Sequence, residues 1–114
     1  MVGSGVAEDY HARWWERQSP PAGVTIRTLR RDWTGLAIAG PRSRELLARL
    51  VRDDLSNTAI PFLSYARLEV GRIGAQVARL SFTGELGYEL WVPSDLQLAL
   101  FDQLREAGAD LGLT

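Results

Sequence analysis

Residues 65–92, YARLEVGRIGAQVARLSFTGELGYELWV, alternate between apolar and polar side chains in three stretches. Such alternation is typical of half-buried strands, because successive side chains of a strand point to opposite faces of a sheet. Gly71 and Gly74 separate the first two stretches, which predicts a hairpin between them. The pattern therefore predicts strands near residues 66–70, 74–82 and 87–92.

The remainder of the chain adds helices and further extended segments. Apolar residues recur at helical spacing in three segments, 5–17, 41–51 and 94–107. Ser94 with Gln97 three residues later predicts a capping box at the start of the last helix. Short extended segments are expected at 1–4, 24–31 and 35–40, whereas residues 52–64 have the composition of a connecting loop. The order β-α-β-β-α-β-β-β-α predicts an α+β fold, with a mainly antiparallel sheet covered by helices on one face.

Composition and charge exclude several classes of function. The chain has 114 residues, 46% hydrophobic and 24% charged, as expected for one soluble globular domain or a piece of one. Its 13 basic and 14 acidic side chains nearly cancel, so neither nucleic acid nor an anionic membrane is an expected partner. There is no cysteine and only one histidine, so no metal site is expected. Neither a signal peptide nor a membrane-spanning run is present, and a cytoplasmic location is expected.

Three short motifs are better explained by structure than by chemistry. Gly3 and Gly5 match the start of a dinucleotide-binding turn, but Glu8 replaces its third glycine and would repel a pyrophosphate. His11 has no nucleophile near it in sequence, and the adjacent tryptophans favour a packing or surface role. The basic residues of 27–44 are interleaved with acidic ones, which is typical of a solvated face with local ion pairs.

The sequence allows two roles for Glu89, a ligand-binding carboxylate or a member of a surface ion pair. Alternation along residues 88–92 places Glu89 and Trp91 on one face of a strand, opposite its apolar residues. Gly84 and Gly87 allow the preceding loop to fold tightly and bring Phe82 near Glu89. A carboxylate beside aromatic rings can bind a flat heterocycle that presents two adjacent N–H donors. An ordinary surface ion pair at Glu89 is the alternative.

The stretch SFTGELGYELWVP, residues 81–93, resembles the signature of the aminomethyltransferase folate-binding family, which includes the glycine cleavage T protein. GLAIAGPRSRELLARL (35–50) and DDLSNTAIPFLSYARLEVG (53–71) are similar to the tetrahydrofolate-binding region of dimethylglycine and sarcosine dehydrogenases. MVGSGVAEDYHARWWE (1–16) is similar to the segment that precedes that region. The resemblance covers nearly the whole chain and implies that residues 1–114 are a partial folate-binding domain of the aminomethyltransferase type.

The resemblance assigns two cofactor-binding residues. Glu89 matches the glutamate that binds the pterin ring of tetrahydrofolate, whose 2-amino group and N3–H form an adjacent donor pair. Phe82 matches an aromatic position that lines the folate site and is commonly tyrosine. Gly84, Glu85 and Gly87 match loop-forming positions, and no ligand role is assigned to Glu85.

The implied function is that of part of a folate-dependent enzyme. Such an enzyme transfers a one-carbon unit from an N-methyl amine (dimethylglycine, sarcosine or a glycine-derived aminomethyl group) to tetrahydrofolate. The family's catalytic aspartate would precede residue 1, and an arginine-bearing segment would follow Thr114. No catalytic residue is therefore assigned within the chain, which looks like a fragment that is inactive by itself. FAD is expected only in a full-length dehydrogenase, and the expected partners are folate and either the remainder of the domain or a flavin-containing domain or subunit.

The sequence leaves open whether the chain is part of an active enzyme. The alternative is a non-catalytic remnant of the family, kept for structure or for contacts with a partner. A branch of the family that supports iron–sulfur cluster assembly is disfavoured, because Ser81 and Phe82 stand where that branch has a Cys-Tyr pair.

Overall fold

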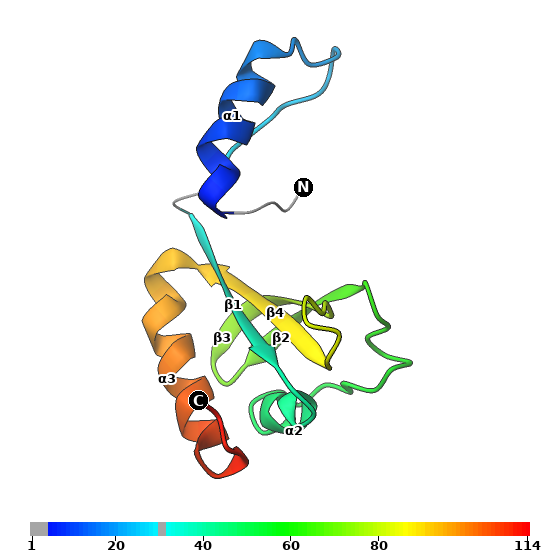
Figure 1. The fold of residues 1–114 in the computed structure, drawn as a ribbon, viewed down its shortest axis with the longest axis vertical. Coiled ribbons are helices and arrows are strands. Elements are labelled where there is room, and N and C mark those ends of the chain that lie inside the picture. Colours follow the sequence, from blue (N-terminus) through cyan, green and yellow to red (C-terminus); the bar gives the residue numbers. More distant parts are fainter. Residues whose placement is uncertain (1–4, 30–31) are drawn as a thin grey trace. The chain divides into compact units, whose positions relative to one another are not determined.

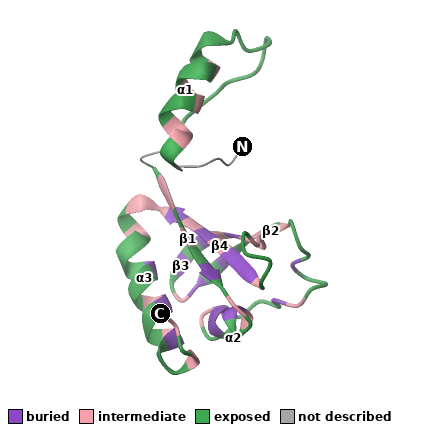
Figure 2. Ribbon diagram, in the orientation of Figure 1, coloured by how far each residue is buried: buried purple, intermediate pink, exposed green. Residues whose placement is uncertain are grey.

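The structure is a computed structural model that describes residues 5–29 and 32–114, and it divides the chain into two compact units (Figure 1). The first unit ends at Asp32 and contains a short 3₁₀ turn, Gly5–Ala7, followed by helix α1, Glu8–Arg17. None of the α1 residues is buried, and Figure 2 shows the helix without a buried position. The predicted helix at 5–17 is confirmed from Glu8 onward.

The second unit, Trp33–Thr114, is built around a four-stranded antiparallel sheet. Its strands are β1 (Trp33–Ala39), β2 (Tyr65–Val70), β3 (Ile73–Ala78) and β4 (Gly87–Pro93), in the spatial order β1-β4-β3-β2. The predicted hairpin is confirmed, because β2 and β3 pair through a two-residue turn in which Val70 faces Ile73. β4 is a central strand, paired with β1 on one side and with β3 on the other.

Two helices complete this unit. α2 (Ser43–Ala48) follows β1, and α3 (Gln97–Gly108) follows β4. Apolar side chains from both helices join alternate residues of the strands in one buried core, which contains Leu46, Leu47, Leu100 and Leu104 from the helices and Tyr88, Leu90 and Val92 from β4. The fold is thus α+β with an antiparallel sheet and helices on one face, as the sequence predicts.

An ion-pair network links α2 to the end of α3. Arg49 pairs with Glu45 on its own segment and with Asp110 in the closing 3₁₀ turn, and it also donates to the Ala107 carbonyl at 2.8 Å. The hydrogen bond from Arg49 holds the pKa of Asp110 below its ordinary value, and a hydrogen bond from Arg42 does the same for the pKa of Glu45. These contacts fix the C-terminal turn against α2.

Several predicted elements differ from the observed ones. The segment expected to be extended at 24–31 forms no strand over its described residues, 24–29, because no described segment pairs with it, and Val24, Ile26 and Leu29 are exposed. The segment at 1–4 lies outside the described residues. α2 covers only 43–48 of the predicted 41–51, and β3 ends at Ala78, four residues earlier than expected.

The predicted capping box is also wrong. Residues 94–96 form a 3₁₀ turn, and α3 begins at Gln97 with no side-chain cap. The Ser94 hydroxyl lies instead 3.0 Å from the hydroxyl of Thr34 on β1. A tertiary partner has therefore replaced the local one. No helix in the described ranges is long and apolar enough to cross a membrane.

Candidate functional site

The face of the sheet opposite α2 and α3 carries Glu89. Along β4, Tyr88, Leu90 and Val92 are buried in the core, while Glu89 and Trp91 are half-buried on the other face. Strand alternation alone produces this division, and it places the two residues on a shared face as the sequence predicts. A polar side chain on a central strand is accessible here because no helix of the second unit packs over it.

The Glu89 carboxylate is positioned by its neighbour on the same face. The indole Nε1–H of Trp91 donates to Oε2 of Glu89 over 3.3 Å. The indole itself lies against Gly35 of β1, its register partner, where a Cβ on residue 35 would approach Trp91 Cε2 and Cε3 to 3.1 Å. Glycine at 35 thus makes room for the ring, and the ring holds one oxygen of the carboxylate.

Space is also available on either side of Glu89. Its register partners are Ala37 on β1 and Ala78 on β3, so only methyl groups flank the carboxylate on the two adjacent strands. Within residues 5–29 and 32–114, Glu89 forms no ion pair, and its one side-chain hydrogen bond comes from Trp91. The surface ion pair considered as the alternative role for Glu89 is therefore absent from the described part of the chain. Most of the accepting capacity of the carboxylate remains available.

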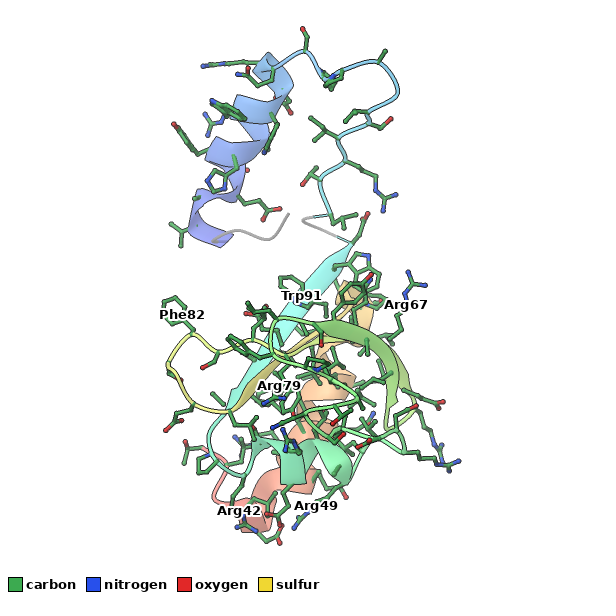
Figure 3. All side chains as sticks on the ribbon, turned by 90° about the vertical axis from the view of Figure 1, so that its right-hand side faces the viewer. Arg42, Arg49, Arg67, Arg79, Phe82 and Trp91 are labelled. Carbon is green, nitrogen blue, oxygen red and sulfur yellow. The ribbon has the colours of Figure 1, made fainter. Side chains whose placement is uncertain are left out.

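Phe82 lies apart from this arrangement. It belongs to the loop 79–86, and its side chain is fully exposed and points away from the sheet (Figure 3). The structure does not bring Phe82 into contact with Glu89. The neighbouring Ser81 hydroxyl is buried without a hydrogen-bond partner in the described chain, an arrangement that costs on the order of 1–3 kcal/mol.

The end of the loop, in contrast, is tightly fixed. The Leu86 carbonyl accepts hydrogen bonds from the Gly40 backbone N–H at 2.8 Å and from the Ser43 hydroxyl at 3.0 Å. Gly87 lies so close to the Leu80 carbonyl that a Cβ would approach its oxygen to 2.8 Å. The glycine that ends the TGELG loop is therefore required by close backbone packing at the start of β4.

A cluster of two arginines supports the same end of β4 from the core side. Arg44 donates from Nε to the hydroxyl of buried Tyr88 at 3.0 Å and from Nη2 to the Asn57 side-chain oxygen. Arg79 donates to that same oxygen at 2.7 Å and to the Ile60 carbonyl at 3.0 Å. The cluster attaches the loop 52–64 to α2 and to the residue after β3. The sequence does not predict this cluster, because its members are far apart along the chain and belong to no local motif.

No group of three or more metal-binding side chains converges anywhere in the described ranges. An oriented carboxylate beside an indole ring can accept two hydrogen bonds from a planar ligand and cover part of its surface, so this face has groups suited to binding such a ligand.

Known families and proteins resemble this chain over most of its length. Residues 1–114 match the GCVT N-terminal domain. The chain is 35% identical to human mitochondrial dimethylglycine dehydrogenase over 115 aligned residues, which cover 99% of this chain and 13% of that protein. It is 38% identical to the sarcosine oxidase subunit alpha of Rhizobium meliloti, covering 82% of this chain and 10% of that one. It is also 38% identical to the aminomethyltransferase of Mycolicibacterium paratuberculosis, covering 81% of this chain and 24% of that enzyme.

A solved structure shares the fold. The heterotetrameric sarcosine oxidase from Corynebacterium sp. U-96, in complex with pyrrole 2-carboxylate, superimposes with a TM-score of 0.66 at 16% identity. The match covers 75% of this chain and 43% of that one. The chain thus spans between a tenth and a quarter of these curated relatives, and less than half of the structural neighbour.

Proposed function

Because the chain belongs to the GCVT N-terminal domain family, we propose that it forms part of a tetrahydrofolate-binding domain. The domain would serve an enzyme that transfers a one-carbon unit from an N-methyl amine, or from a glycine-derived aminomethyl group, to tetrahydrofolate. This substrate class is supported by the names of three relatives: a dimethylglycine dehydrogenase, a sarcosine oxidase subunit alpha and an aminomethyltransferase. The observation that carries the proposal is the Glu89 carboxylate, which is oriented by Trp91, flanked by two alanines and free of any cation in the described chain.

The pterin ring of tetrahydrofolate fits the chemistry of this site. Its 2-amino group and N3–H point in the same direction and can donate to the two carboxylate oxygens of Glu89 together. Ala37 and Ala78 leave room for a planar ring above the sheet, and the Trp91 indole supplies apolar surface at its side. Glu89 would thus orient the pterin, and the tetrahydrofolate cofactor would accept the one-carbon unit.

We further propose that Phe82 contributes an aromatic wall to the same site when folate is bound. Its ring is now exposed to solvent, and the adjacent Ser81 hydroxyl lacks a partner in the described chain. A movement of the loop 79–86 that placed Phe82 on the ligand would bury its apolar surface and could give Ser81 a hydrogen bond. The loop is fixed at Arg79 and Leu80 and again at Leu86 and Gly87, which would limit the movement to residues 81–85.

Under this proposal, the partners are folate and the remaining domains of a longer enzyme. FAD would be bound only by a full-length dehydrogenase and not by this segment, and the chain would act in the cytoplasm. A non-catalytic role is the second candidate, since Phe82 does not reach Glu89 in the observed conformation. In that case the domain would contribute structure or partner contacts without binding folate.

The test is a titration of folinic acid into the full-length protein that contains this chain. Glu89→Gln keeps the side-chain volume but turns one accepting oxygen into a donor that faces the donors of the pterin. The exchange should weaken binding by roughly ten- to hundredfold, as expected for a charge-assisted hydrogen bond of about 1.5–3 kcal/mol. Glu85→Gln, in the exposed part of the loop 79–86, is the control and should leave affinity unchanged. Equal, measurable affinities of the wild-type and Glu89→Gln proteins would show that Glu89 does not hold the pterin, whereas the absence of binding to the wild-type protein would favour the non-catalytic candidate.

A further inference from the structure

Four register partners form a row across the sheet, one on each strand, on the face opposite α2 and α3. Ala37 of β1 pairs with Glu89 of β4, Glu89 pairs with Ala78 of β3, and Ala78 pairs with Tyr65 of β2. Because directly paired residues share a face of a sheet, Tyr65 lies on the same face as Glu89, with one alanine between them. Each pairing separates two Cβ atoms by about 5 Å, so the Cβ atoms of Glu89 and Tyr65 are roughly 10 Å apart.

The Glu89 carboxylate has its wider opening on the side of the row where Tyr65 lies. The Trp91 indole lies against Gly35 of β1 and donates to Oε2 of Glu89, so the indole leans toward β1. On the β3 side, Ala78 contributes only a methyl group to the surface of the sheet. A flat ligand bound by the carboxylate therefore has room over Ala78, and the next side chain that it meets along the row is Tyr65.

The Tyr65 ring is free to make such a contact. Its side chain is 70% exposed, and neither its ring nor its hydroxyl has an aromatic, cationic or hydrogen-bonding partner in the described ranges. An exposed aromatic ring is stabilised when a second flat ring covers it, because both rings then bury apolar surface. Unlike Phe82, Tyr65 is held on the face of Glu89 by strand pairing, so the contact requires no movement of a loop.

The backbone that leads into Tyr65 is held in a strained conformation. Leu63 has a φ of 65°, in the left-handed region that leucine seldom adopts. The Leu63 N–H donates to the Arg79 carbonyl at 3.0 Å, and the Arg79 N–H donates to the Ser64 carbonyl at 2.9 Å. These bonds join the start of β2 to the end of β3 and fix Tyr65 opposite Ala78. Strain that is enforced in this way is found most often at binding sites.

We propose that Tyr65 is a specificity-determining residue of the Glu89 site, where it contacts the second ring of a fused bicyclic ligand. This inference rests on the proposed function and adds a residue that lies outside the TGELGYE motif. A single ring bonded to Glu89 lies over Ala78 and ends before β2, whereas a fused second ring extends to Tyr65. The site therefore selects a bicyclic heterocycle over a monocyclic one that carries the same pair of N–H donors.

The experiment compares the affinities of the full-length protein for two ligands by NMR titration. 6-Methyltetrahydropterin has two fused rings, and 2-amino-4-pyrimidinone has one ring with the same donor pair. The wild-type protein should bind the pterin roughly tenfold more tightly or better, and Tyr65→Ala should lower this ratio about three- to tenfold by weakening the binding of the pterin alone. Tyr65→Phe keeps the ring and should keep the ratio. Tyr10→Ala, which removes an equally exposed tyrosine from α1, is the matched control and should also keep it.

Glu89→Gln separates this inference from the proposed function. Both ligands use the donor pair, so this variant should weaken both by a similar factor and leave their ratio unchanged. If Glu89→Gln does so, but Tyr65→Ala leaves the ratio at its wild-type value or weakens both ligands equally, the inference about Tyr65 is wrong and the role of Glu89 stands. If the wild-type protein does not bind the pterin, the proposed function and the inference are both overturned.

Discussion

The indole of Trp91 lies against the backbone of Gly35, its partner across the β1–β4 pair, so closely that a Cβ on residue 35 would approach the ring to 3.1 Å. This contact holds the indole in the position from which its Nε1–H reaches Glu89. The geometry of the candidate site therefore depends on a residue that has no side chain. A substitution on β1 can disturb a carboxylate on β4 without touching it.

Gly35→Ala tests this packing. The added methyl group would approach Trp91 to 3.1 Å, so the indole must shift, and we expect the protein to lose about 1 kcal/mol of stability. In a Trp91→Ala background the same substitution should be neutral or slightly stabilising, since alanine is less costly to order than glycine. Urea unfolding of the four proteins in this cycle measures the coupling. A cost of Gly35→Ala that persists without the indole would contradict the account.

Gly87→Ala should be more damaging, because the obstacle is backbone. A Cβ there would lie 2.8 Å from the Leu80 oxygen and 3.3 Å from the Ile38 oxygen, and neither can move without displacing a strand or the loop. We expect a loss of about 1–3 kcal/mol in the free energy of unfolding, measured by urea denaturation. Gly74→Ala is the matched control, since its Cβ would enter open space, and its stability should be unchanged or slightly raised.

Arg79→Met should release the loop 52–64. Methionine keeps much of the apolar stem of arginine but removes the hydrogen bonds to Asn57 and to the Ile60 carbonyl. We expect faster amide hydrogen exchange across residues 52–64, together with a stability loss of about 1–3 kcal/mol. Arg67→Met removes a guanidinium that has no such bond in the described chain, and exchange in this loop should then stay at the wild-type rate.

The contact of Arg49 with Asp110 predicts a dependence of stability on pH. Because the hydrogen bond lowers the pKa of folded Asp110, the contact stabilises the protein above the ordinary aspartate pKa of about 3.9. This contribution is lost as the pH falls through the lowered value. Asp110→Asn should therefore unfold at a lower temperature than wild type at pH 7, and the two should converge under strongly acidic conditions.

Asp102→Asn, an exposed position on α3, provides the control for that comparison. Added salt should also narrow the difference at pH 7, since both partners of the Arg49–Asp110 pair are accessible to solvent. A difference between wild type and Asp110→Asn that is the same at pH 7 and in acid would show that the charge of Asp110 does not matter.

The sequence was most informative where one face of an element is buried. Strict alternation in β2, β3 and β4 identified the hairpin and placed Glu89 with Trp91, because a shift of one residue would have turned Leu90 out of the core. Residues 24–29 have a similar apolar content but form no strand, since a strand also requires a pairing partner that alternation cannot supply. Strand periodicity thus identified only those strands that have a neighbouring strand to pair with.

The parts of the site that the sequence could not predict depend on tertiary contacts, which join residues far apart along the chain. Local spacing favoured a capping box at Ser94, but Thr34, sixty positions earlier, bonds to its hydroxyl. The two glycines of the loop before β4 suggested that Phe82 would fold back toward Glu89, and its ring points into solvent instead. The packing of Gly35 under Trp91 and the convergence of Arg44 and Arg79 on Asn57 depend on the β1–β4 pairing and on the path of a long loop, neither of which has a local signal.

The central claim is that the Glu89 carboxylate accepts hydrogen bonds from the pterin, and its most direct test changes the ligand and the protein together. Wild-type and Glu89→Gln proteins, in full-length form, are titrated with tetrahydrofolate and with its 2-desamino analogue, which lacks one of the two donors assigned to Glu89. If the carboxylate accepts the 2-amino hydrogen, removing that group should cost the wild-type protein on the order of tenfold in affinity or more and the Glu89→Gln protein much less, so that the two changes are coupled. Equal losses in the two proteins would mean that Glu89 does not contact the pterin, and would contradict the account.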